Sequence, residues 1–173
     1  LMKHAEALTS ITCSTVNSYN GLVPRVGGFE GGTVTWAPTN ITYGHNNRSA
    51  QFRLPQNRYC IENRAADMTM NVYLAFSMTL AAAVEGIKMK IHPGKPTDQD
   101  LYEMTDKEFK KLGIKRLPRN LLMALEALKN DRLSDEVIGT VMKNSLLAYK
   151  NDEWERYHQA VTDWEVKEYL RLY

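Results

Sequence analysis

Residues 44–64, GHNNRSAQFRLPQNRYCIENR, carry several arginines and one glutamate among residues that favour β-strands. Apolar side chains stand beside these charges, with Phe52 and Leu54 before the glutamate and Ile61 directly next to it. A strand that only faces solvent has no use for this mixture, because large apolar side chains prefer the interior. Part of the charge is therefore expected to face something other than water.

Side chains alternate along a strand, so residues of one parity share a face. In an expected strand over residues 58–64, one face carries Arg58, Cys60, Glu62 and Arg64. One guanidinium group can bind two phosphate oxygens at once, and a hard cation such as Mg²⁺ takes carboxylate oxygens as ligands. These residue types indicate chemistry on phosphate.

Arg48 and Arg53 have opposite parity in an expected strand over residues 48–54. Either Arg48 precedes the strand, in the turn before it, or a β-bulge intervenes. A structural alternative also stays open, in which Glu62 only pairs with an arginine across the strands. Such a pair stabilises a sheet by about 0.2 to 1 kcal/mol.

The elements that must position these residues are antiparallel strands first and a helical C-terminal half after, so the expected class is α+β. Residues 1–8 read as the middle of an amphipathic helix, and residues 9–32 as a glycine-rich loop. Three strands are expected, the last two joined as an antiparallel hairpin by residues 55–57. Five helices are expected, the first buried beneath a sheet. The expected strands and helices cover residues 33–37, 48–54, 58–64, 71–91, 105–113, 118–130, 134–161 and 162–172.

Composition excludes several classes of protein. The 173 residues suit one domain, and a net charge of +2 gives no electrostatic case for nucleic acid. The apolar run over residues 72–84 has about 13 residues where a bilayer span needs about 20, so no membrane segment is expected. Cys13 and Cys60 suggest neither a disulfide framework nor a metal site, which favours a reducing, cytoplasmic setting. His45 and His92 lie in turns without partners at metal-ligand spacing.

Several motifs together carry a family resemblance. KHAEAL, STVNSY, LVP, WAPTNITYGHNNRSAQFRLP, IENRAADMTMNVYLAF, GIKMKIHPG and VTDWEVKEYL follow one another in this order. Together they closely resemble the C-terminal part of glutamine synthetases, and the TWAP and YGHNNR portions look most like the branch with glutamate–methylamine ligases. The resemblance covers essentially residues 1–173, which are expected to be the C-terminal part of one catalytic domain.

The resemblance implies an ATP-dependent carbon–nitrogen ligase that phosphorylates the side-chain carboxylate of glutamate and then joins ammonia or a small amine to it. It implies Mg²⁺ or Mn²⁺ as cofactor, with Glu62 as a metal ligand. By their places in the motifs, Arg64 resembles a glutamate-binding residue and Arg48 one that touches glutamate and phosphate. Arg53 resembles a residue on the ATP phosphates. The family's ATP-binding lysine ahead of the metal glutamate is absent here, and Arg58 is a near substitute for it.

The chain departs from the family pattern in its glycine-rich loop. Asn20 and Gly21 stand where the family has Lys-Arg, so a glutamate-binding arginine is missing unless Arg25 replaces it. Glu30, in GGFEGG, resembles the catalytic glutamate that deprotonates ammonium, although a solvated loop glutamate is the alternative. These departures are expected to bear on the acid or amine that the enzyme accepts.

The family's N-terminal domain and the first half of its catalytic domain have no counterpart in these residues. The expectation is a piece of a longer protein, inactive alone, whose full-length form is a ring-shaped homo-oligomer. Three alternatives remain open: a non-catalytic regulatory or structural relative, a ligase for a different acid or amine, and an independent nucleotide- or RNA-binding domain.

Overall fold

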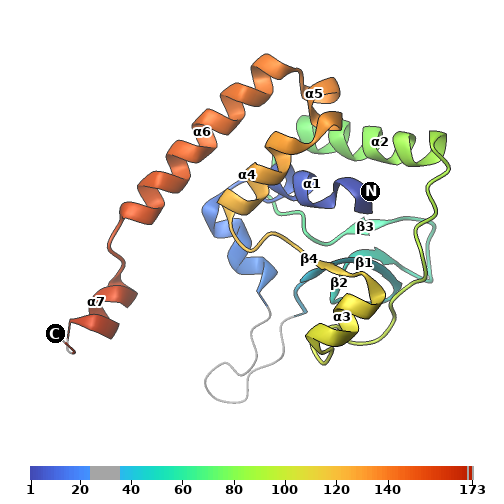
Figure 1. The fold of residues 1–173 in the computed structure, drawn as a ribbon, viewed down its shortest axis with the longest axis horizontal. Helices are drawn as coiled ribbons and strands as arrows, with labels where there is room; N and C mark the ends of the chain where they lie inside the picture. The colour runs from blue at the N-terminus through green and yellow to red at the C-terminus, as the bar shows by residue number, and fades with distance from the viewer. Residues whose placement is uncertain (24–35, 171, 173) are drawn as a thin grey trace.

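The structure is a computed structural model that describes residues 1–23, 36–170 and 172 (Figure 1). A sheet and its covering helices form the body, and the last two helices extend away from it. The elements follow in the order η1 (Met2–His4), α1 (Ala5–Thr12), η2 (Val16–Leu22), β1 (Asn40–His45), β2 (Ala50–Leu54), β3 (Glu62–Asn63), α2 (Val72–Lys88), α3 (Asp106–Leu112), β4 (Lys115–Arg116), α4 (Leu121–Asn130), α5 (Arg132–Ile138), α6 (Thr140–Gln159) and α7 (Asp163–Tyr169).

The four described strands form one sheet in the order β3-β2-β1-β4. The predicted hairpin is confirmed, because β2 and β3 pair antiparallel. The prediction of antiparallel strands throughout was wrong, since β1 runs parallel to β2 and antiparallel to β4. The class is nevertheless α+β, with a mixed sheet followed by a helical C-terminal half.

The predicted strands differ from the described ones at their ends. β1 was missed, although its burial alternates along NITYGH as expected for a strand with one covered face. Residues 33–35 of the first predicted strand lie outside the described residues, and Trp36 and Ala37 belong to no strand. The hairpin arm is shorter than predicted, because residues 56–61 are exposed and only Glu62 and Asn63 pair with β2.

Helix α1 forms the centre of the core. Ala5, Leu8 and Ile11 are buried with Phe52 of β2 and Met78 of α2, so α1 fills the space between the sheet and α2. The N-terminal helix was predicted, but it continues to Thr12 where a loop was expected, and η2 follows with Thr15 as its cap. The i, i+3 and i+4 spacing of small and apolar residues explains why one helix can pack on both neighbours.

Helix α2 is not the buried helix that its sequence predicted. Its buried residues are Ala75, Met78 and Ala82, on one stripe, whereas Tyr73, Phe76 and Leu80 are all more than 60% exposed. The error is instructive, because uniform hydrophobicity predicts that a helix is covered all round and this chain covers only one side. Exposed apolar surfaces of this kind are typical of sites where a protein contacts another protein, a membrane or a ligand.

The capping signals located most helix ends correctly. Thr105 and Thr162 both form capping boxes, and α3 ends at Gly113 in the left-handed region, φ 65°. The long helix predicted from Ser134 is instead two helices, because Asp131 caps α5 and Gly139, φ 81°, separates α5 from α6. α4 begins at Leu121 with Asn120 as its cap, three residues later than the predicted start at Pro118.

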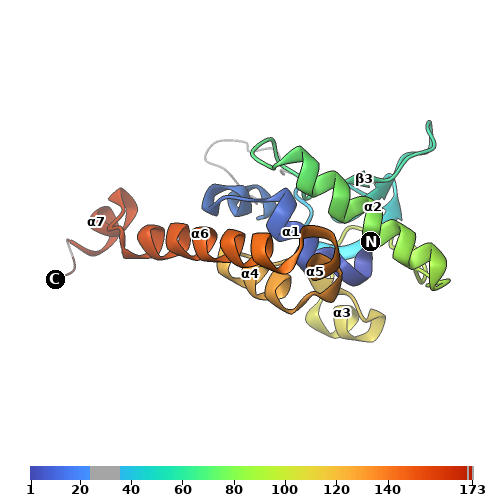
Figure 2. The same cartoon turned by 90° about the horizontal axis from the view of Figure 1, so that it is seen from above.

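Helices α6 and α7 form an arm that leaves the body, as both views show (Figure 1 and Figure 2). Lys143 is the buried residue of α6, near its start, and α7 buries no described residue. Within the described residues, no helix has both the length and the apolarity needed to cross a membrane.

Candidate functional site

The hairpin brings Arg53 and Glu62 directly opposite each other in register. Arg53 Nη1 donates to Glu62 Oε2 at 2.8 Å, and Arg53 Nη2 donates to Asn46 Oδ1 at 2.8 Å. Arg58 contacts the second carboxylate oxygen of Glu62 from the exposed end of the hairpin. The carboxylate is therefore held between two guanidinium groups at the edge of the sheet that β3 forms.

These contacts determine the charge state of Glu62. The hydrogen bond from Arg53 lowers its pKa most, and Arg58 acts in the same direction, while desolvation opposes both. A carboxylate that accepts charge-assisted hydrogen bonds stays ionised well below neutral pH. Glu62 is thus a fixed anion within a cationic site.

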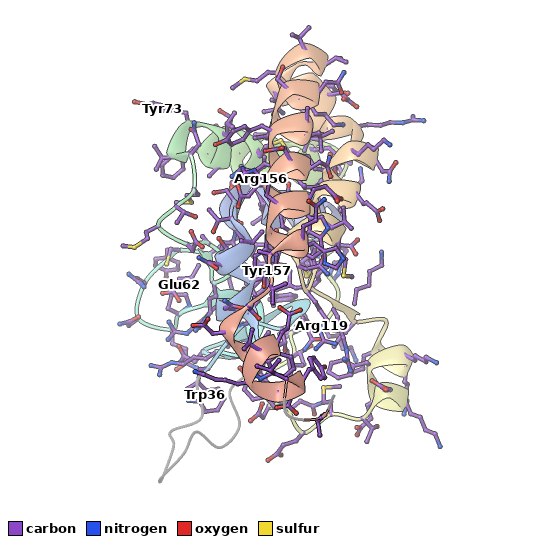
Figure 3. The ribbon with its side chains drawn as sticks, turned by 90° about the vertical axis from the view of Figure 1, so that its left-hand side faces the viewer. Trp36, Glu62, Tyr73, Arg119, Arg156 and Tyr157 are labelled. Atoms are coloured by element: carbon purple, nitrogen blue, oxygen red, sulfur yellow. The ribbon has the colours of Figure 1, made fainter. Side chains whose placement is uncertain are left out.

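Arg64 lies two residues after Glu62, so strand alternation puts its side chain on the same face of the sheet. Its Nη2 donates to the carbonyl oxygen of Trp36 at 3.0 Å. Burial lowers the pKa of Arg64 most, and repulsion from Arg48 and Arg53 adds to this effect. Figure 3 labels Glu62 beside the strands and Trp36 below it, where the described segment begins after residue 35.

Arg48 precedes β2, so the first of the two sequence-based alternatives is correct. Its neighbours fix the turn: Asn47 Nδ2 donates to the carbonyl oxygens of Thr97 and Gln99, and Asn47 Oδ1 accepts from the backbone N–H of Ser49 at 2.9 Å. Arg48 itself is exposed. An anchored turn therefore presents its guanidinium close enough to Arg64 to repel it.

The remaining predicted site residues divide into three cases. Arg58 joins the site through Glu62 but is 62% exposed at the side chain. Cys60 was expected on the same strand face, yet it lies in the exposed loop before β3. Glu30 and Arg25 lie outside the described residues.

The structure adds residues that the sequence did not single out. Gln51 is fully buried on β2, and neither polar atom of its carboxamide has a partner in the described part of the chain. The Nε atoms of Arg53 and Arg64 are likewise buried without partners there. Unpaired buried polar groups cost free energy, so their concentration on one face indicates a place where a ligand or water supplies the missing bonds.

A divalent metal does not fit the described residues alone. They contain no group of three or more His, Cys, Asp or Glu side chains placed to hold a metal ion. Glu62 offers one carboxylate, and two arginines already neutralise it. Mg²⁺ uses several oxygen ligands, so further ligands would have to come from outside these residues.

A hollow of about 570 Å³ lies between the hairpin and the C-terminal part of α2. Phe52, Leu54, Ile61, Ile87 and Ile91 contribute to its mostly apolar wall. None of the charged site residues lines it. The charged face and the apolar hollow are therefore separate features on neighbouring parts of the molecule.

Comparison with known proteins places this geometry in a family. The model of the family described as glutamine synthetase, catalytic domain, matches residues 1–169. A glutamine synthetase of Methanocaldococcus jannaschii is 41% identical over 173 residues, which is 98% of this chain and 36% of that protein. A glutamate–methylamine ligase of Methyloversatilis universalis is 42% identical, across all of this chain and 38% of that protein.

The fold agrees with the sequence comparison. The solved structure of a GmaS/ADP complex superposes with a TM-score of 0.81 at 33% identity, covering 99% of this chain and 38% of that one. The chain thus spans well under half the length of the relatives that it matches. Its sequence and fold together show that the chain belongs to the glutamine synthetase catalytic-domain family.

Proposed function

We propose that the full-length protein containing this chain uses ATP to join ammonia or a small amine to the side-chain carboxylate of glutamate. The observation that carries the proposal is that Arg53 and Arg58 contact Glu62, while Arg48 and Arg53 lie close enough to Arg64 to repel it. The relatives are a glutamine synthetase and a glutamate–methylamine ligase, and a solved relative holds ADP. A site rich in guanidinium suits a nucleotide phosphate, an amino acid carboxylate and a phosphorylated intermediate.

The reaction has two steps. An oxygen of the glutamate side-chain carboxylate attacks the γ-phosphorus of ATP, the bond to the β-phosphate oxygen breaks, and ADP leaves with a γ-glutamyl phosphate behind. The amine nitrogen then attacks the acyl carbon, the carbon–oxygen bond to phosphate breaks, and phosphate leaves as the nitrogen loses a proton. Negative charge accumulates on phosphate oxygens in both steps, where positioned cations stabilise it.

Each predicted site residue has a role in this proposal. Arg53, held by Glu62 and Asn46, binds the phosphates of ATP, and Arg58 assists it. Arg48 contacts both the transferred phosphoryl group and glutamate, and Arg64 binds a carboxylate of glutamate. Glu62 contributes one ligand for Mg²⁺ or Mn²⁺, and Glu30 acts as the base that accepts the proton from the amine.

The rest of the full-length protein has to complete the site. The described residues do not supply a metal site, and the exposed apolar side of α2 offers a large surface for another segment to cover. We therefore expect the 173-residue chain to have no ligase activity alone, and the full-length protein to be a ring-shaped homo-oligomer. Phosphate release by the purified chain with ATP, glutamate and amine would contradict the first expectation, and light scattering on the full-length protein checks the second.

The test of the function is phosphate release by the full-length protein with ATP, glutamate and a panel of ammonia, methylamine, ethylamine and ethanolamine. We expect turnover with one or more of these amines, and its loss in a Glu62→Ala variant. Asp152→Ala is a matched control, because Asp152 also pairs with an arginine but lies on the exposed surface of α6. A folded oligomer that shows no turnover with any of the four would overturn the proposal.

A further inference from the structure

Gln51 is the fully buried glutamine of the site strand. Its exposed fraction is 0%, yet neither Oε1 nor Nε2 has a hydrogen-bond partner among the described residues. Its neighbours on β2, Ala50 and Phe52, point into apolar clusters beneath the sheet. Because side chains alternate along a strand, Gln51 points to the opposite face, together with Arg53.

The register places Gln51 next to Arg64. Arg53 pairs with Glu62 and Phe52 with Asn63, so extending this register by one residue puts Arg64, just after the end of β3, opposite Gln51. The backbone N–H of Arg64 donates to the carbonyl oxygen of Gln51 at 2.8 Å, which fixes the two residues side by side. Side chains directly opposite each other on one face of such a pair have Cβ atoms about 5 Å apart.

The unpaired groups of these two residues are complementary. Arg64 has a buried Nε that lacks an acceptor, and Gln51 has a buried carbonyl oxygen that lacks a donor. In this structure the guanidinium of Arg64 is instead turned toward the carbonyl oxygen of Trp36. A buried carboxamide with both ends unpaired is costly, so a hydrogen bond between Gln51 and Arg64 in another side-chain arrangement would relieve both.

We propose that Gln51 is a positioning residue for Arg64, whose guanidinium it orients toward the carboxylate of the acid substrate. The proposal rests on the function proposed above and adds a residue to its acid-binding side. Gln51 Oε1 accepts from Arg64 Nε, which leaves the two terminal nitrogens of the guanidinium for a bidentate contact with the substrate carboxylate. Gln51 acts through Arg64 and touches neither ATP nor the amine.

The test is steady-state kinetics of the full-length protein with a Gln51→Met variant, which keeps the length of the side chain and removes its hydrogen bonds. We expect the KM for glutamate to rise about tenfold, the worth of one hydrogen bond to a charged group. The KM for ATP and kcat are expected to stay within about twofold by the same reasoning, because Arg53 is untouched. Urea unfolding of the variant checks that it is folded, so that a change in the KM for glutamate can be assigned to Arg64 rather than to lost structure.

A matched control is Ser134→Ala, another fully buried polar residue whose hydroxyl is hydrogen bonded far from the site. It should lower stability and leave every KM unchanged. An unchanged KM for glutamate in Gln51→Met would overturn the inference while the proposed function stands. If the wild-type protein does not turn over, the proposed function fails, and calorimetric titration with glutamate decides the inference: weaker binding by Gln51→Met supports it, and equal or absent binding overturns it.

Discussion

The chain contains two clusters of charge that are built in opposite ways. The site cluster, formed by Arg48, Arg53, Glu62 and Arg64, lies at the β3 edge of the sheet. The Nε atoms of Arg53 and Arg64 are buried there without hydrogen-bond partners among the described residues. The second, which we call the His4 cluster, is formed by His4, Glu85, Asp131 and Lys143. It lies between helices, and none of its side-chain atoms is among the buried, unpartnered atoms of the described residues.

The side chains of the His4 cluster have hydrogen-bond partners in one another or in directly neighbouring groups. His4 Nδ1 lies 2.6 Å from Asp131 Oδ2, and His4 Nε2 lies 2.6 Å from Glu85 Oε2. Both distances are within hydrogen-bond range, and a carboxylate oxygen can only be the acceptor. Lys143 Nζ donates to the carbonyl oxygen of Asp131 at 3.0 Å and to Asp135 at 2.8 Å. The cluster thereby joins η1, α2, α5 and α6.

Hydrogen-bond pairing distinguishes the charges that hold the fold together from those that bind a ligand. Charges that hold elements together are paired on every side, because an unpaired partner would weaken the fold. Charges that await a ligand keep hydrogen-bonding capacity that the chain itself does not use. The site cluster meets the second description, and the predictions that follow test the distinction on the full-length protein.

The largest effect on stability is expected from His4→Leu. It removes the shared partner of Glu85 and Asp131 and should cost about 3 kcal/mol of unfolding free energy, as when one member of a buried ion pair is removed. Urea unfolding measures it. Lys3→Leu is the matched control, because Lys3 also pairs with Glu85 but is 47% exposed, and it should cost less than about 1 kcal/mol. Equal losses in the two variants would break the comparison.

The next effect concerns activity, and is expected from Arg53→Leu. Loss of a cation from a transferring phosphoryl group should lower kcat about 100-fold. Unfolding free energy should fall by only about 1 kcal/mol, because the pair with Glu62 lies on a partly wet face. Phosphate release and urea unfolding on the same preparations measure both. A variant that loses much of its unfolding free energy but keeps its kcat would show that Arg53 serves the fold and not the reaction.

The smallest effect is a dependence of stability on pH. The pKa of Glu62 is lowered from 4.5 in the folded chain, mainly by Arg53. Its contribution to stability is thus complete above pH 4.5 and is lost as pH falls through the lowered value. The difference in unfolding free energy between the wild-type protein and Glu62→Gln should shrink as the pH is lowered through this window. A constant difference would show that the ionised form of Glu62 adds nothing to the fold.

Local signals in the sequence predicted the parts of the fold that depend on few residues. The capping boxes at Thr105 and Thr162 and the β2–β3 hairpin were predicted correctly, because neighbours in the chain determine them. β1 was missed, since its pairing with β2 and β4 depends on distant partners. α2 was wrongly predicted as buried because hydrophobicity does not say which segment covers a helix.

The site was predicted to a similar extent. Strand parity placed Glu62 and Arg64 on one face, but the predicted loop over residues 55–57 would have paired Arg53 with Tyr59, whereas the observed register pairs it with Glu62. Gln51 shares that parity and could have been found by the same reasoning, but an amide among arginines attracts no attention until its burial is known. His4 could not be assigned from sequence, because its partners lie 81 and 127 residues away.

The central claim is that the site cluster serves acyl phosphate chemistry. The most direct measurement supplies the full-length protein with ATP, amine and glutamate labelled with oxygen-18 in its side-chain carboxylate, and analyses the released phosphate by mass spectrometry. We expect the released phosphate to carry a labelled oxygen, since that oxygen bridges carbon and phosphorus in the intermediate. We expect Glu62→Ala to release no labelled phosphate. Unlabelled phosphate from the wild-type protein would mean that ATP is hydrolysed without acyl transfer, and would contradict the account.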